Sequence, residues 1–300
     1  MNILVVGGSG MIGGAIANHL SSKGETVTIS GRNKVENSSS LASLPFLKGD
    51  FVGGTYTSEQ ISGFDAVVFS AGHDVRHVPN EVDFYNHSML ANTHKAPEFA
   101  ELCKKSGVKK FINIGSFYPH IAPNLVDSNG YIRSRKEGSE KMLQLNSDTF
   151  TAISLDAPFV VGSVPGLKNQ MFEMYVAYAQ GKLEIPVFGP KGGTNFISNK
   201  SLAEAVYGAL IRGKGGKAYL IGDQNLTFSE YFQLFFEAAG NNVPVPELDQ
   251  EHPLLPDSAI FTGRGHYISY QADQAENNLL KYSQNDIARA VKEIVAQFSH

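Results

Sequence analysis

The sequence begins MNILVVGGSGMIGG over residues 1–14, where an apolar run leads through glycines into a helical pattern. Gly7, Gly10 and Gly13 are spaced three residues apart. Gly7 can adopt a positive φ in a tight turn, Gly10 lets phosphates approach the backbone, and Gly13 lets the helix pack closely on its strand. A strand, a glycine turn and a helix N-terminus in this order predict a binding site for the pyrophosphate of a dinucleotide. A glycine turn that binds no ligand is the alternative.

Strand and helix patterns alternate along the rest of the chain. Ile12, Ile16 and Leu20 recur every four residues, which predicts one buried helix face, and Gly24 stands where that helix should end. Further strands are predicted at residues 26–30, 64–69, 111–114, 150–155 and 218–221, and further helices at residues 88–106, 131–145, 202–210, 227–240 and 287–298. Pro97 predicts a kink or a break in its helix. The alternation predicts an α/β protein with a Rossmann-like doubly wound parallel sheet and a smaller C-terminal substrate-binding lobe.

Composition predicts how the chain divides into two parts. Residues 1–162 are expected to form a dinucleotide-binding Rossmann domain, which residues 195–223 complete. Residues 163–194 and 224–300 are expected to form the substrate-binding lobe, because glycine and proline become frequent after the first domain. Four prolines fall between residues 241 and 265, where periodicity is weak. This long excursion is a candidate cover for a substrate.

Charge and composition narrow the classes of partner. The chain has 25 basic and 29 acidic residues, a net charge of −4 and no basic stripe, so neither nucleic acid nor a membrane surface is an expected partner. No apolar run reaches the length of a membrane span, and no basic segment precedes the first strand, so no signal peptide is expected. The single Cys103 is expected to be a buried core thiol. We expect a cytoplasmic monomer or homodimer whose partner is a small-molecule substrate.

Residues that follow the predicted strands are candidate cofactor ligands, because an open parallel sheet binds ligands at the C-terminal ends of its strands. Ser30 and Gly31 stand where an NAD-binding protein usually offers a carboxylate to the ribose 2′-hydroxyl, and Arg32 follows. A guanidinium at that position can pair with a 2′-phosphate. The sequence therefore favours NADP over NAD, with an exposed loop arginine as the alternative.

Two later strand ends offer further contacts. Asp50 is predicted to accept a hydrogen bond from the adenine amino group, or else to be a turn aspartate that needs no ligand. Ser70, Ala71 and Gly72 are small enough to let the cofactor lie against the backbone.

Ser116 and Tyr131 are candidates for the chemical step. Ser116 follows a predicted strand, and Tyr131 begins a predicted helix. A tyrosine hydroxyl can exchange a proton with a substrate oxygen if nearby positive charge lowers its pKa from about 10. Arg135 lies one helical turn further on the same side, whereas Lys136 is rotated by about 100°. A helix-terminal aromatic and a packing serine are the alternatives.

Histidines are numerous near the expected substrate face. His73, His77, His87 and His94 are not combined with acids or cysteines at a zinc-binding spacing. No metal site is predicted.

These motifs together resemble the short-chain dehydrogenase/reductase superfamily, in particular its extended branch of NAD(P)-dependent epimerases, dehydratases and reductases. The resemblance runs nearly end to end and includes Asn92 and residues 48–50, 107–111, 157–162 and 195–198. It implies that Ser116 hydrogen-bonds the substrate oxygen and that Tyr131 is the acid/base. The family's lysine, four residues after the tyrosine, binds the nicotinamide ribose, and Arg135 takes its place here.

The residues and the resemblance predict an NADP-preferring oxidoreductase that transfers hydride between nicotinamide and a carbonyl or secondary alcohol. The reaction is either a net reduction or the internal redox cycle of an epimerase or dehydratase. The alternative is an NAD(P)-binding redox sensor or scaffold with little turnover. The residues predicted to bind the cofactor are Gly7, Ser9, Gly10, Met11, Ile12, Gly13, Arg32, Asp50, Phe51, Ser70, Ala71, Gly72, Asn92 and Phe159.

Overall fold

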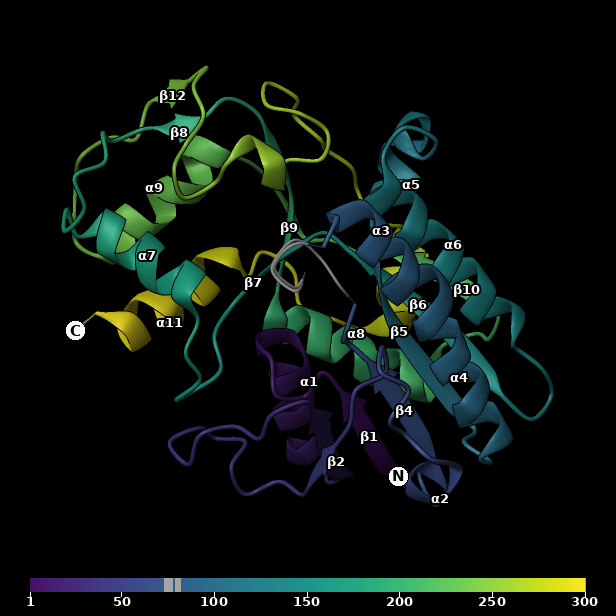
Figure 1. Ribbon diagram of the computed structural model, residues 1–300. Coiled ribbons are helices and arrows are strands. Elements are labelled where there is room, and N and C mark those ends of the chain that lie inside the picture. Colours follow the sequence, from purple (N-terminus) through teal and green to yellow (C-terminus); the bar gives the residue numbers. More distant parts are fainter. Residues whose placement is uncertain (73–77, 79–81, 300) are drawn as a thin grey trace.

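A sheet of seven parallel strands forms the centre of the computed structural model, which describes residues 1–72, 78 and 82–299 (Figure 1). The strands are β1 (Asn2–Val6), β2 (Thr26–Gly31), β3 (Phe46–Lys48), β4 (Ala66–Phe69), β5 (Lys110–Ser116), β6 (Thr151–Ala157) and β10 (Lys217–Leu220). They lie in the order β10-β6-β5-β4-β1-β2-β3. The order reverses where β1 meets β4, and doubly wound sheets bind their ligands outside the carboxyl ends of the strands at that point. The predicted Rossmann-like sheet is confirmed.

Helices cover both faces of this sheet. The helices of the first domain are α1 (Met11–Ser22), α2 (Ser58–Ile61), α3 (Phe84–Ser88), η2 (Met89–Lys95), α4 (Ala96–Lys105), α5 (Tyr118–Ile121), η3 (Pro123–Leu125), α6 (Gly130–Gln144) and α8 (Asn199–Arg212). One face packs against α1 and α8, with Ile112 and Ile114 of β5 in that core. Phe111 of the same strand points into the core under α4 and α6. Successive residues of β5 enter different layers because strand side chains alternate between the two faces.

The helical segment before β5 is irregular. It passes from α3 through the π-helix η2 into α4. Pro97 lies in the first turn of α4, where its missing N–H group costs no hydrogen bond. The interruption expected from this proline is present as the π-helical turns immediately before it. Asn92, one of the cofactor candidates, lies in those turns.

The second lobe is built around an aromatic core. Its elements are β7 (Phe159–Val161), α7 (Gln170–Ala179), β8 (Gly189–Pro190), β9 (Gly193–Ser198), β11 (Gln224–Thr227), α9 (Phe228–Ala238), β12 (Glu247–Leu248), η4 (Asp257–Ala259) and α11 (Ile287–Phe298). The short helix α10 (Gln274–Leu280) packs instead on α8, and its Leu280 belongs to the core of the main sheet. β7, β9 and β11 form a separate three-stranded sheet, on which α7, α9 and α11 pack. Thr227 and Glu230 make a capping box at the start of α9, a helix that the sequence predicts. The predicted lobe boundaries stay a prediction. β10 belongs to the seven-stranded sheet, whereas β7 and β9 pair in the three-stranded sheet.

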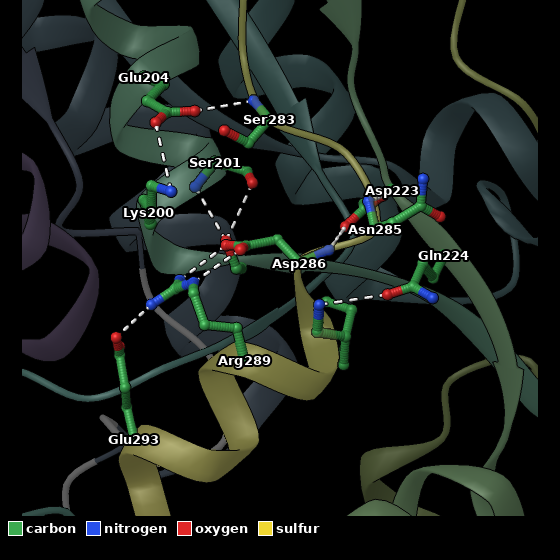
Figure 2. Close-up of polar contacts among 12 residues, drawn as sticks. Lys200, Ser201, Glu204, Asp223, Gln224, Ser283, Asn285, Asp286, Arg289 and Glu293 are labelled. Carbon is green, nitrogen blue, oxygen red and sulfur yellow. Dashed lines mark hydrogen bonds and ion pairs between the residues drawn. The ribbon is translucent and has the colours of Figure 1, made fainter.

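A polar network joins α11 to the start of α8 (Figure 2). Asp286, 7% exposed, accepts hydrogen bonds from Ser198 Oγ at 2.6 Å and from Arg289 Nε at 2.6 Å. Asp223 accepts from the backbone N–H groups of Asn285 and Asp286. Burial acts to raise the pKa of Asp286, but the bonds from Arg289 and Ser198 outweigh it and lower that pKa. Charge-assisted hydrogen bonds thus hold the C-terminal helix on the main domain.

Two expectations about composition can be checked in the same structure. Cys103 is fully buried, and burial raises the pKa of its thiol, as expected for a core residue. Among the helices of the described ranges, none is both long and apolar enough to cross a membrane.

Candidate active site

The glycine turn has the backbone geometry that the sequence predicts. Gly7 has a φ of +81°, and its N–H donates to the Ser30 carbonyl at 2.9 Å. A Cβ atom on Gly13 would lie 2.3 Å from the Gly7 carbonyl oxygen and 2.5 Å from Ser70 Oγ. A Cβ atom on Gly10 would find its nearest neighbour, Gly7 O, at 3.4 Å. The fold itself therefore requires glycine at positions 7 and 13, whereas Gly10 leaves room beside the turn.

The first turn of α1 offers backbone donors. No side chain of the described residues caps this helix, whose N-cap is Gly10. Its first N–H groups, those of Met11 and Ile12, therefore have no side-chain acceptor there. Helix N-terminal N–H groups and the helix dipole stabilise an anion at this position. The residues present thus fit a pyrophosphate.

The end of β2 carries an arginine and no carboxylate. Ser30 is fully buried, and its Oγ donates to the Leu47 carbonyl at 2.7 Å. Ser9 Oγ lies 2.5 Å from where a Cβ atom on Gly31 would stand. Arg32 is the next residue along the chain, and its side chain is exposed. Arg32 is therefore the charged group nearest in sequence to the strand end that faces the glycine turn.

The next two candidates, Asp50 and Phe51, make contacts that stabilise the fold. Asp50 Oδ1 accepts a hydrogen bond from Val52 N–H at 3.0 Å, which is the turn-aspartate geometry weighed as the alternative. Phe51 is 6% exposed and packs edge-on against Phe69 at 4.9 Å between centroids. The Phe51 ring is therefore part of the core, and contact of this residue with a ligand stays a prediction.

The small residues after β4 contact the end of β1 and the Arg135 side chain. Ser70 Oγ donates to the Val6 carbonyl at 2.8 Å, which joins the ends of β4 and β1. A Cβ atom on Gly72 would lie 3.0 Å from Arg135 Nη1. The run of Ser70, Ala71 and Gly72 therefore lets the Arg135 guanidinium approach the end of β4.

Tyr131 and Arg135 share one side of α6. Asn129 caps the helix, and its Oδ1 accepts from the N–H group of Tyr131 at 3.0 Å. Arg135 Nη1 donates to Tyr131 Oη at 3.3 Å, and Nη2 donates to the Ile114 carbonyl at 2.8 Å. Lys136 instead pairs with Glu140 at 2.7 Å on the solvent side. The group beside the phenol is therefore Arg135, as the helical spacing predicts.

Ser116 is the last residue of β5, two positions after the Ile114 carbonyl that Arg135 contacts. It is 7% exposed, and its Oγ accepts from the N–H of Tyr118 at 3.4 Å. Burial raises the pKa of Tyr118, and the nearby Tyr131 raises it further. Ser116, Tyr118 and Tyr131 thus gather at one strand end, which is where the sequence places the chemistry.

An aromatic belt adjoins the Tyr131 ring. The belt consists of Phe84, Phe117, Tyr118, Tyr131, Phe261 and Tyr270. Phe261 stacks on Tyr131 with 4.4 Å between centroids and 17° between ring planes. Phe261 belongs to the excursion over residues 241–265, which the sequence predicts as a cover. Sequence reasoning missed the residue itself, because one phenylalanine in an aperiodic segment gives no signal of where its ring lies.

A second group that sequence reasoning missed lies behind β5. His120 Nε2 is 2.6 Å from Asp156 Oδ2, and Asp156 Oδ1 accepts from Ser154 Oγ at 2.6 Å. The hydrogen bond with Asp156 raises the pKa of His120. Gly115 makes this possible, since a Cβ atom there would lie 1.7 Å from Asp156 Oδ1. Only the fold brings His120 and Asp156 together.

Two cofactor candidates are tied to the packing around α6 and the second lobe. Asn92 is buried, and its Nδ2 donates to Ser134 Oγ at 3.2 Å. Phe159 packs against Phe196 and Tyr231, with centroids 5.4 and 5.8 Å away. Their contact with a dinucleotide stays a prediction.

Two of the four histidines near the expected substrate face lie within the described residues. His87 is buried and His94 is exposed, whereas His73 and His77 lie outside the described residues. Within the part of the chain that the structure describes, no group of three or more His, Cys, Asp or Glu side chains could hold a metal ion.

The fold and this site define a dinucleotide-binding α/β protein of the short-chain dehydrogenase/reductase type. The model of the NAD dependent epimerase/dehydratase family matches residues 3–222. The chain belongs to this family, which confirms the resemblance seen in its motifs. Comparison with curated proteins gives no match.

Several solved structures share the fold over their whole length. They include gox2253 (20% identity, TM-score 0.79, covering 99% of this chain and 97% of that one), WbmH of Bordetella bronchiseptica in complex with NAD+ (18%, 0.75, 100% and 98%), and UDP-glucose 4-epimerase from Bifidobacterium longum in complex with NAD+ and UDP (17%, 0.76, 100% and 98%). At these identities the similarity shows the fold alone.

Proposed function

We propose that this protein is an NADP(H)-dependent oxidoreductase of the extended short-chain type, acting on a carbonyl or secondary alcohol of a small molecule. The observation that carries the proposal is the 3.3 Å hydrogen bond from Arg135 to Tyr131 Oη. It lies at the carboxyl end of β5, on the same edge of the parallel sheet as the glycine turn after β1. A dinucleotide that lies along this edge joins the two places.

Each residue of the reaction centre has a defined task. Ser116 donates a hydrogen bond to the substrate oxygen and positions it. Tyr131 gives its proton to that oxygen as the carbonyl is reduced, and takes a proton back in the reverse reaction. Arg135 donates to the phenol oxygen and stabilises the negative charge left on it. The nicotinamide ring supplies or accepts the hydride.

The choice of NADP rests on Arg32. WbmH and the Bifidobacterium longum epimerase are solved with NAD+. In this chain the end of β2 offers no carboxylate to a ribose 2′-hydroxyl, and exposed Arg32 instead follows Gly31, which itself lies against Ser9. A guanidinium pairs with a phosphate through two parallel hydrogen bonds, so a 2′-phosphate suits this end of the site. A cytoplasmic location and a monomeric or homodimeric state stay predictions.

Net reduction and an internal redox cycle use the same residues. UDP-glucose 4-epimerase from Bifidobacterium longum has the fold of this chain. In an epimerase or dehydratase the hydride returns to the substrate, whereas a reductase consumes one NADPH per turnover. Stoichiometric loss of NADPH absorbance therefore identifies the reductase.

The test is the Tyr131→Phe variant, assayed for NADPH-dependent turnover on a panel of ketones, aldehydes and nucleotide sugars. Turnover should fall by a factor on the order of 10² to 10⁴, because the proton donor is lost, while the affinity for NADPH is retained. Tyr85→Phe is the matched control, since Tyr85 is 46% exposed on α3. An unchanged rate in Tyr131→Phe removes this residue from the mechanism.

A redox sensor or scaffold is the second candidate, and the arginine in the family's lysine position is the observation that favours it. Arginine retains the positive charge but not the geometry of a lysine. NADPH binding without turnover of any compound in the panel would support the sensor.

A further inference from the structure

Four residues of the aromatic belt are partly exposed. Phe84, Tyr118, Phe261 and Tyr270 are half-buried, whereas Phe117 and Tyr131 are buried. Phe84 and Phe261 stack with 6.0 Å between centroids and 11° between planes. Tyr118 meets Phe261 edge-on at 5.5 Å. Phe84 and Phe261 therefore keep part of their surface exposed while they stack on the Tyr131 ring.

The segment that carries Phe261 and Tyr270 is anchored. A hydrogen bond links Tyr118 to the Phe261 backbone. Tyr270 Oη donates to the Ile221 carbonyl at 2.7 Å, and Asn225 Nδ2 donates to the Tyr270 carbonyl at 2.9 Å. Rings held in place before binding lose little conformational entropy when a ligand arrives.

The charge of this cover disfavours an anionic substrate. Residues 241–270 contain one basic residue, Arg264, against four acidic residues, Glu247, Asp249, Glu251 and Asp257, for a net charge of −3. Arg264 is already paired, with Nη1 2.9 Å from Asp249 and Nε 3.0 Å from Asp257. Lys191 on the adjoining loop also faces Asp249, at 3.9 Å. These carboxylates already pair both cations, which lowers the attraction of this segment for a pyrophosphate.

We infer that the substrate is an uncharged aromatic carbonyl compound, or the corresponding alcohol, whose ring lies against the aromatic belt, and not a nucleoside diphosphate sugar. This inference rests on the proposed function. In the reduction, the carbonyl carbon accepts hydride from NADPH and the oxygen accepts the proton of Tyr131, so NADP+ and an alcohol form. Aromatic rings bind one another in offset-stacked or edge-on arrangements, which are the two arrangements that the belt displays.

The first experiment compares three ligands on the full chain saturated with NADP+: 4-phenyl-2-butanone, 2-butanone and UDP. Calorimetry should detect binding of the phenyl ketone at least about tenfold tighter than that of 2-butanone, because one ring buries far more apolar area than a methyl group. UDP should not bind at millimolar concentration. Micromolar UDP binding, or equal affinity for the two ketones, overturns the inference.

The second experiment uses Phe261→Leu, which keeps an apolar side chain and removes the flat ring. Its KM for 4-phenyl-2-butanone should rise by about two- to tenfold, with a smaller change for 2-butanone. Tyr267→Leu is the control, because Tyr267 is 48% exposed on the same segment and outside the belt. An identical change for both ketones in Phe261→Leu contradicts a role for its ring in recognition.

The failure of this inference is distinct from the failure of the proposed function. Turnover of UDP-glucose that Tyr131→Phe abolishes keeps the oxidoreductase and overturns the aromatic substrate. Tight binding of the phenyl ketone without NADPH oxidation keeps the aromatic site and counts against the oxidoreductase.

Discussion

The glycine turn and the Tyr131 end of the site are built in different ways. The turn consists of backbone, and its key residues, Gly7, Gly10 and Gly13, lie within one short stretch of chain. The Tyr131 end consists of side chains that meet from α3, α5, α6 and the loop around residue 261. Binding of a common cofactor can thus be encoded locally, whereas recognition of a particular substrate depends on contacts between distant segments.

Two separate alanine variants, at Gly13 and at Gly10, should give the largest effects and test the glycine turn. Gly13→Ala should lower the free energy of unfolding by about 1–3 kcal/mol, because its Cβ would lie 2.3 Å from the Gly7 carbonyl. Gly10→Ala should fold normally, since its Cβ has 3.4 Å of space, yet lose NADPH affinity by about 100-fold if phosphates approach there. Denaturant unfolding and NADPH titration separate the two effects. Full affinity in Gly10→Ala would place the phosphates elsewhere.

Removal of the Arg135 side chain tests the side-chain half. A hydrogen bond to a charged group contributes about 1.5–3 kcal/mol, so Arg135→Ala should reduce turnover by roughly 10- to 100-fold. Arg135→Lys should recover part of the loss, because an ammonium restores the positive charge beside Tyr131. Lys136→Ala is the control, since that side chain pairs with Glu140 instead. Equal rates in Arg135→Ala and the unaltered protein would mean that the 3.3 Å contact has no catalytic role.

Exchange of Arg32 tests whether the backbone half also selects the cofactor. In Arg32→Ala, the loss of the pairing with a 2′-phosphate should weaken NADPH binding by about tenfold and leave NADH binding unchanged. Lys34→Ala removes a neighbouring exposed charge and serves as the control. Fluorescence titration with NADPH and with NADH measures the two affinities. Equal affinities of the unaltered protein for NADPH and NADH would contradict the assignment of Arg32 to the 2′-phosphate.

What the sequence could predict follows the same division. The alternation of strands and helices, the glycine turn and the side of α6 shared by Tyr131 and Arg135 depend on local periodicity and spacing, and the structure has all of them. The stacking of Phe261 on Tyr131 joins residues 130 positions apart, and periodicity carries no information about such a pair. The same holds for His120 and Asp156, which only the packing of α5 against β6 brings together.

The His120–Asp156 pair should produce the smallest effect, a pH-dependent one. The hydrogen bond raises the pKa of His120 in the folded state, so its stabilisation is complete below the unfolded value of about 6.5 and is lost as pH rises through the raised value.

Solvent screens the pair, because the His120 side chain is 37% exposed, so the contribution stays below about 1 kcal/mol. Denaturant unfolding between about pH 5.5 and 8.5 should show stability declining with pH more steeply in the unaltered protein than in His120→Gln. His94→Gln, on an exposed histidine of η2, should keep the original slope. Parallel slopes for all three proteins would mean that the 2.6 Å contact is not formed in solution.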